Sequence, residues 1–227
     1  MVNTMEHTFY IVDYPRKSDF AEAAIIPVEY DYTRVVKCPQ CGERVSGGYW
    51  KHPREVVLTR QKTPDFLYAY CDAAPFVLSK KAIEEITQAG LRGIECFEEI
   101  ESVRFQRKSK KERTVPQYYH VELSRSCMTI DHQKSVIKYG ASKDRTPCSV
   151  CRQVPATYDF FRSLAFHTDD YEGFDIFQIY ELGNTVFLSE RFVKFYENST
   201  LTNLHYGPAR KHDAWAASYF LDGEENA

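Results

Sequence analysis

Two pairs of cysteines with CxxC spacing constrain this chain more than any other feature. The first pair is Cys38 and Cys41 in CPQCG, and the second is Cys148 and Cys151 in CSVCR. A tight CxxC turn aims both sulfurs at one point, and four thiolates complete the tetrahedral shell of a structural zinc ion. Gly42 suits the first turn because glycine permits a positive φ. The sequence therefore predicts one zinc ion held by all four cysteines.

The two pairs lie far apart in the chain. Compact zinc ribbons separate their cysteine pairs by about 15–20 residues, whereas here the second pair starts more than a hundred positions after the first, at Cys148 against Cys38. A shared ion would therefore tie together distant segments. Two unrelated turns, or a disulfide at one or both pairs, are the alternatives.

An internal similarity has the same offset. The segment DFLYAYCDAAPFVLS from Asp65 aligns without a gap with DIFQIYELGNTVFLS from Asp175. The offset from Asp65 to Asp175 equals the offset from Cys38 to Cys148. Each copy predicts a strand, a turn, a second apolar strand that ends in Leu-Ser, and a helix. Ser79 and Ser189 are the expected N-caps, because a serine hydroxyl accepts hydrogen bonds from the first N–H groups of a helix.

These observations favour a duplication, although few identities support it and a chance recurrence of the strand–helix pattern is the alternative. A third strand is expected after each helix, at 94–97 and 204–206. We expect an α+β fold of two related β-rich halves, each with a CxxC zinc knuckle and one main helix, joined at the shared four-cysteine zinc site. The halves would be residues 1–103 and 118–227, and the basic run RFQRKSKKER would belong to a linker or hairpin tip at 104–117.

Composition disfavours several classes of protein. The formal net charge of −3 gives no support for nucleic acid as the main partner. No stretch approaches the roughly 20 apolar residues of a membrane span, and the first twenty residues lack the pattern of a signal peptide. The seven cysteines, an odd number, disfavour a secreted disulfide framework, so we expect a cytoplasmic protein that does not bind membranes.

The remaining cysteines and the histidines show no pattern of a second site. Cys71, Cys96 and Cys127 lie in apolar or strand-like stretches and are expected to be small buried side chains. No HExxH, P-loop, G-x-S-x-G or glycine-rich nucleotide-binding motif occurs. No catalytic residue is therefore assigned.

The same motifs resemble a known family. The CPQCG knuckle, the second CxxC and the FLSERF…LTNLHYGP ending at 187–208 resemble the double-CxxCG immunity proteins of bacterial polymorphic toxin systems. The ending alone resembles that of a wider set of immunity proteins. Arg152 departs from the family pattern, which has Gly after the second pair. The resemblance implies a non-enzymatic cytoplasmic antidote that binds a cognate toxin and neutralises it, with the zinc ion in a structural role.

Two other functions are open on the residues alone. A zinc-ribbon nucleic-acid-binding or regulatory protein would carry a basic stripe continuous with the knuckles, but the densest basic run, at 104–113, is separate from them in sequence. A zinc enzyme would need an open coordination position, which four cysteines do not leave. For a toxin-binding surface, the basic run and the carboxylates of Glu98, Glu99 and Glu101 are the exposed candidates.

Overall fold

The protein, described here from a computed structural model, is a mixed α+β structure made mostly of strands. The structure describes residues 7–13, 19–25, 29–35, 37–38, 40–44, 48–69, 76–106, 114–139, 148, 158–182 and 185–211. Within these ranges it has two α-helices, α1 (Lys80–Gln88) and α2 (Glu190–Asn198). Neither of these helices has the length and apolar character that crossing a membrane requires.

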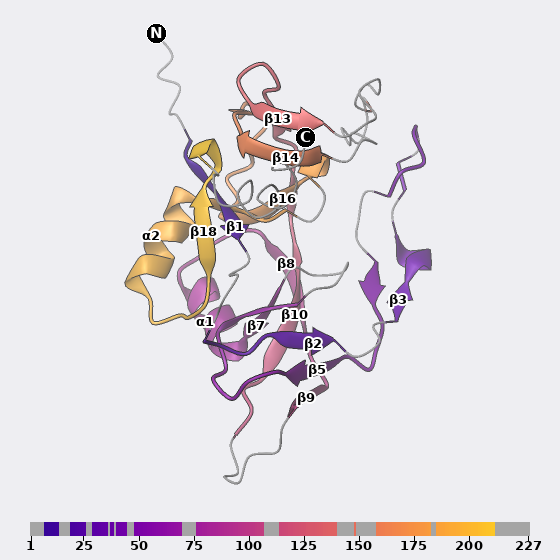
Figure 1. Cartoon of the computed structure of the whole chain (residues 1–227), viewed down its shortest axis with the longest axis vertical. Coiled ribbons are helices and arrows are strands. Elements are labelled where there is room, and N and C mark those ends of the chain that lie inside the picture. Colours follow the sequence, from indigo (N-terminus) through magenta and orange to yellow (C-terminus); the bar gives the residue numbers. More distant parts are fainter. Residues whose placement is uncertain are drawn as a thin grey trace, which may run out of the picture.

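Two sheets form the centre of the structure, and in each of them one strand leads directly into a helix (Figure 1). The first has the order β6-β7-β10-β8, from β6 (Phe66–Tyr68), β7 (Phe76–Ser79), β10 (Tyr118–Leu123) and β8 (Ile94–Glu99). The second has the order β11-β16-β17-β1-β18, from β11 (Arg125–Ser126), β16 (Ile176–Ile179), β17 (Phe187–Ser189), β1 (Phe9–Asp13) and β18 (His205–Pro208). Helix α1 follows β7 directly, and α2 follows β17.

Each central sheet contains a strand from a distant part of the chain. Strand β1 pairs antiparallel with both β17 and β18, so the beginning of the chain lies between two strands near its end. Strand β10 pairs antiparallel with both β7 and β8, which precede it in sequence. The order β16-β17-β1-β18 therefore matches the order β6-β7-β10-β8, and in each the third strand lies outside the stretch of sequence that holds the other three.

Smaller sheets flank this centre. A three-stranded sheet has the order β2-β5-β9, from β2 (Ala23–Ile25), β5 (Glu55–Leu58) and β9 (Ser102–Phe105). The two-stranded sheets pair β12 (Thr129–Ile130) with β15 (Phe166–His167), β13 (Val136–Tyr139) with β14 (Tyr158–Ser163), and β3 (Tyr30–Asp31) with β4 (Tyr49–Trp50). Short 3₁₀ helices occur at η1 (Tyr32–Arg34), η2 (Tyr180–Leu182) and η3 (Ala209–Lys211).

The β3–β4 hairpin projects from the body of the molecule, on the right in Figure 1. We call this hairpin, with the segment 37–44 beyond it, the arm. At the base of the arm Trp50 is almost fully buried, and it packs with Leu67 and Tyr118 in a core between the first central sheet and the three-stranded sheet. The arm is therefore attached to the body through apolar contact at its base.

The largest apolar core joins the two helices. Ile83 and Ile86 of α1 lie in the same buried cluster as Phe192 and Val193 of α2. In α1 the two isoleucines are three positions apart, so they lie on one face of the helix. Leu78 of the first central sheet and Leu188 of the second lie in the same cluster, so one face of each sheet shares a core with both helices.

A local structure recurs at the offset that separates the cysteine pairs. The Asp65 carboxylate accepts a hydrogen bond from the Ser79 hydroxyl at 2.7 Å, and the Asp175 carboxylate accepts one from the Ser189 hydroxyl at 2.8 Å. Each serine Oγ also accepts a hydrogen bond from the backbone N–H three residues later, at 3.1 Å. The two predicted N-caps are thus confirmed. Each serine is oriented by the aspartate that directly precedes β6 or β16.

Each of these aspartates also binds the segment that follows the other helix. Asp65 accepts hydrogen bonds from the N–H and the hydroxyl of Thr202, after α2, at 3.0 and 2.9 Å. Asp175 accepts one from the N–H of Arg92, after α1, at 2.9 Å. The offset from Arg92 to Thr202 equals the offset from Asp65 to Asp175, so the two contacts are reciprocal.

Three expectations about cysteine burial have different outcomes. Cys96 and Cys127 are exposed, so the prediction that they are buried is wrong. Cys96 lies on β8, a terminal strand of its sheet, and Cys127 lies in the short segment between β11 and β12. Cys71 lies outside the described residues.

Candidate metal centre

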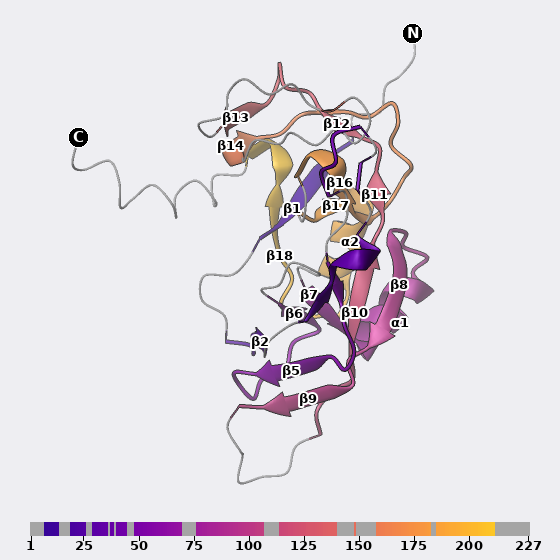
Figure 2. The ribbon, with the colours of Figure 1, turned by 90° about the vertical axis from the view of Figure 1, so that its right-hand side faces the viewer.

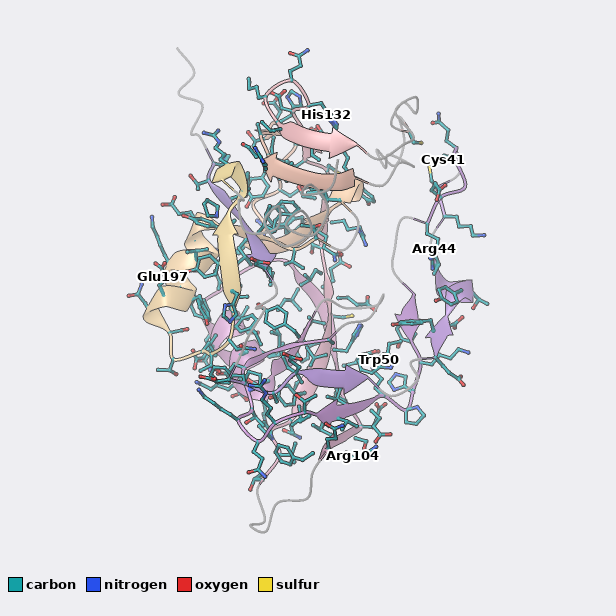
Figure 3. The ribbon with its side chains drawn as sticks, in the orientation of Figure 1. Cys41, Arg44, Trp50, Arg104, His132 and Glu197 are labelled. Carbon is teal, nitrogen blue, oxygen red and sulfur yellow. The ribbon has the colours of Figure 1, made fainter. Side chains whose placement is uncertain are left out.

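Three of the four predicted zinc ligands lie together. The Sγ atoms of Cys38, Cys41 and Cys148 are all within 4.8 Å of one another, with Cys38 and Cys148 buried and Cys41 exposed. Figure 3 shows Cys41 at the far end of the arm, away from its base near Trp50. Cys151 lies outside the described residues, so its role as the fourth ligand stays a prediction.

The spacing of the sulfurs fits a shared metal ion. Cys38 Sγ and Cys148 Sγ are 3.7 Å apart, although the two residues are 110 positions apart in the sequence. In a tetrahedral site with zinc–sulfur bonds of about 2.3 Å, neighbouring sulfurs are about 3.8 Å apart. A disulfide would require about 2.05 Å, and both residues are free cysteines in the structure.

The first CxxC turn has the backbone geometry of a metal-binding knuckle. Lys37 and Arg44 form an antiparallel bridge, inside which the Cys38 N–H donates to the Glu43 carbonyl at 2.8 Å. The Gly42 N–H donates to the Cys38 carbonyl at 2.9 Å, and Gly42 has a φ of 73°. An added Cβ at this glycine would meet nothing within 4 Å, so the turn requires glycine for its backbone conformation.

The same turn favours the ionised form of Cys38. The backbone N–H of Cys41 is the main cause that lowers the pKa of Cys38 to about 6; burial opposes it, and the N–H of Gln40 and the thiols of Cys41 and Cys148 add to it. Because the thiolate is the form that binds metals, the turn prepares Cys38 as a ligand before any ion arrives.

A buried arginine fixes the base of the arm. Arg54 has no exposed surface, its Nε donates to the Trp50 carbonyl at 3.0 Å, and its Nη2 donates to Glu98. The guanidinium also lies over the Tyr49 ring, 5.3 Å from its centroid, and the Tyr49 hydroxyl donates to the Glu98 carboxylate at 3.0 Å. The arm is therefore held at its base by this network. At its tip, Cys38 and Cys41 lie beside Cys148.

The sequence pattern does not predict this network. Arg54 lies in HPREVV, where a charged residue beside a proline indicates a solvated turn. The one sequence feature that points to the network is the group of glutamates around Glu98, which is expected to be an exposed toxin-binding surface. In the structure Glu98 is instead the partner of the buried Arg54.

The other predicted surface residues have mixed outcomes. Glu99 and Glu101 are exposed, as expected. Of the basic run, Arg104 and Phe105 complete β9, and Arg104 pairs with Glu55 at 2.5 Å. Residues 107–113 lie outside the described residues.

The described residues thus define a β-rich α+β protein in which two thiols of a projecting arm lie beside the thiol of Cys148, more than a hundred residues away in the sequence. The model of an immunity protein family (Imm11) matches residues 77–211, which is more than half of the 227 residues and includes both helices and Cys148. The chain belongs to this immunity protein family. No curated protein matches the chain.

Proposed function

We propose that this chain is an immunity protein that binds a cognate bacterial toxin domain and neutralises it in the cytoplasm, without a catalytic activity of its own. Membership of the immunity protein family (Imm11) carries the proposal. The matched segment contains the FLSERF…LTNLHYGP ending that prompted the resemblance to immunity proteins. The first CxxC pair precedes the matched segment, and it supports assignment to the double-CxxCG group within such proteins.

The proposal includes one structural zinc ion, with Cys38, Cys41, Cys148 and Cys151 as its ligands. The convergence of three sulfurs at tetrahedral spacing supports it. A bound zinc ion would supply a cross-link between the arm and the segment around Cys148, with no position open to a substrate. The protein's own contribution is the preformed turn around Cys38, which holds the first ligand ionised and buried.

We further propose that the chain consists of two related halves, 1–103 and 118–227, separated by the basic segment 104–117. The recurring aspartate–serine–helix structure supports this division, as does the repeated strand order. Since β1 lies in the sheet of the second half and β10 in the sheet of the first, the halves would have exchanged one strand each. Two halves built in this way would fold only together.

Co-expression tests the immunity function. We expect a large toxin to be encoded by the neighbouring upstream gene, and its C-terminal domain to arrest growth when it is expressed alone in bacteria. Co-expression of this chain should restore growth, and the two proteins should co-purify. An unrelated toxin domain serves as the control and should remain active. A chain that gives no protection and instead binds nucleic acid with strong salt dependence would show that the proposal is wrong.

A further inference from the structure

Strand β8 (Ile94–Glu99) is a terminal strand of the first central sheet, and no described strand pairs with its outer edge. We propose that a basic, extended segment of the toxin domain docks there, by adding a strand next to β8. This inference rests on the proposed function, and it adds to that function the place and the chemistry of the contact.

The position of β8 makes this edge accessible. It is the terminal strand of the order β6-β7-β10-β8, and in Figure 2 it lies at the right-hand margin of the ribbon. It pairs with β10 in an antiparallel register that aligns Phe97 with Val121. Among the described residues, no strand pairs with its other side.

The hydrogen-bond pattern shows which backbone groups point outward. The Ile100 N–H donates to the Tyr118 carbonyl at 2.9 Å. In an antiparallel pair such bonds recur at every second residue, so Glu98 directs its N–H and C=O toward β10, and Phe97 and Glu99 direct theirs away from it. No hydrogen bond from the described residues reaches these outward groups. A partner strand would find donors and acceptors ready at Phe97 and Glu99.

Phe97 offers an apolar anchor on this edge. Its side chain is 49% exposed, which makes it one of three large apolar side chains exposed among the described residues. The Tyr119 ring packs against one side of the Phe97 ring. The two ring centroids are 5.7 Å apart, and the planes of the rings meet at 85°. The rest of the ring is free to be covered, and exposed aromatic residues of this kind often dominate binding energy at interfaces.

Charge selects the kind of partner. Four glutamates and no basic residue lie between positions 94 and 101. Glu98 is paired with Arg54 and Glu101 with His52, so the charge offered to a partner comes from Glu95 and Glu99. Glu95 and Glu99 are exposed, and the hydrogen bond that Glu99 accepts comes from the neutral Gln117 amide at 3.0 Å. A second copy of this chain would place like charges opposite one another, which is destabilising. Lysine or arginine side chains on the added strand would instead be complementary to this edge.

Amide hydrogen exchange on the full chain tests the strand addition, with the C-terminal domain of the neighbouring toxin as the partner. We expect the amides of Phe97 and Glu99 to exchange at least about tenfold more slowly in the complex. The Glu98 amide, which is already bonded to β10, should change much less and serves as the internal control. A complex that forms without slower exchange at Phe97 and Glu99 would overturn this inference and leave the proposed function standing. Absence of any complex would count against the proposed function itself.

A matched pair of variants, Glu99→Pro and Glu99→Ala, separates backbone pairing from side-chain contact. Proline removes an N–H that points away from β10, which an edge strand tolerates. We expect the Kd of Glu99→Pro for the toxin domain to be about tenfold weaker than that of Glu99→Ala. Equal values for the two folded variants would contradict strand addition. If Glu99→Pro does not fold, the exchange measurement decides.

Charge reversal and oligomeric state complete the test. Glu95→Lys with Glu99→Lys should slow association about tenfold at low salt and weaken its salt dependence. Unchanged association would show that the partner is not selected by charge. The free chain is expected to be monomeric at this edge. A dimer that Glu99→Pro dissociates would make a second copy the occupant and overturn the choice of a basic toxin segment.

Discussion

The carboxylate of Asp65 accepts hydrogen bonds from both the backbone N–H and the hydroxyl of Thr202, although the two residues are 137 positions apart in the sequence. The Asp65 N–H in turn donates to the Thr202 hydroxyl at 3.0 Å. The same carboxylate orients Ser79, the N-cap of α1. One side chain therefore connects the start of β6, the start of α1 and the segment after α2.

Replacing Asp65 should consequently destabilise the whole fold. The side chain is only 14% exposed, and Asp65→Ala leaves several of its donors without an acceptor, so we expect a loss of about 3 kcal/mol in the free energy of unfolding. Thr202→Val should cost about 1–2 kcal/mol. Urea unfolding of both variants and the double variant measures the coupling, which should be about 1 kcal/mol or more. Strictly additive effects would contradict the contact.

Gly93 should tolerate no side chain. It has a φ of 120°, and an added Cβ would lie 1.8 Å from the backbone oxygen of Ile176. We expect Gly93→Ala to lower the free energy of unfolding by more than about 3 kcal/mol, because the backbone of β16 would have to move. Gly173→Ala is the control: its φ of 75° is also positive, but the nearest atom is 3.5 Å away on the Arg92 side chain. It should cost about 1 kcal/mol, and similar losses for the two variants would contradict the predicted clash.

Metal removal should release the arm. We expect one zinc ion per chain in the purified protein, and we expect chelation or Cys38→Ser to remove it and to lower the Tm by about 5 °C or more. The reason is that the ion would link the arm to the segment around Cys148, and no disulfide among the described residues joins them. Cys96→Ser is the matched control, since Cys96 is exposed and remote in sequence from the cluster. Mass spectrometry measures the zinc content, and thermal unfolding measures the Tm. A wild-type protein that contains no zinc and has the same Tm before and after chelation would contradict the site.

The contribution of Glu98 to stability should depend on pH. Burial raises its pKa, but the hydrogen bonds from Arg54 and Tyr49 lower it more, so the pKa lies below its ordinary value. Such a carboxylate stabilises the fold above its unfolded pKa, and this stabilisation is lost as the pH falls through the lower folded pKa.

Glu98→Gln should therefore be less stable than the wild type at pH 7, by about 1 kcal/mol because water partly screens the pair. The difference should shrink as the pH falls below about 4. Urea unfolding at pH 7, 5 and 3 measures it. Glu99→Gln on the same strand is the control, and it should change the free energy of unfolding by less than about 0.5 kcal/mol at pH 7. A difference for Glu98→Gln that stays constant across this range would contradict the assignment.

Short-range patterns predicted the local structures well. The Leu-Ser motifs and the helical spacing after them predicted both helices and both N-caps, which the structure confirms at Ser79 and Ser189. The CPQCG motif predicted the turn with a positive φ at Gly42. These features depend on residues within a few positions of one another, so the sequence carries their full physical cause.

Long-range pairing could not be predicted in the same way. Aromatic and β-branched residues favour strands at β1 and β10, but they do not state that β1 lies between β17 and β18 or that β10 lies between β7 and β8. The equal offsets of the cysteine pairs and the Leu-Ser motifs indicated that distant segments correspond. They did not show that those segments hold each other through Asp65 and Asp175.

By itself the sequence determined the helices, their caps, the knuckle turn and the resemblance to immunity proteins, and the double-CxxCG assignment within them stays a prediction. Only the tertiary structure decided the positions of β1 and β10 within their sheets, the burial of Arg54 and the exposure of Cys96. The physical reason is that a helix cap or a CxxC turn closes its own hydrogen bonds locally, whereas burial and strand order depend on which distant surface covers each side chain.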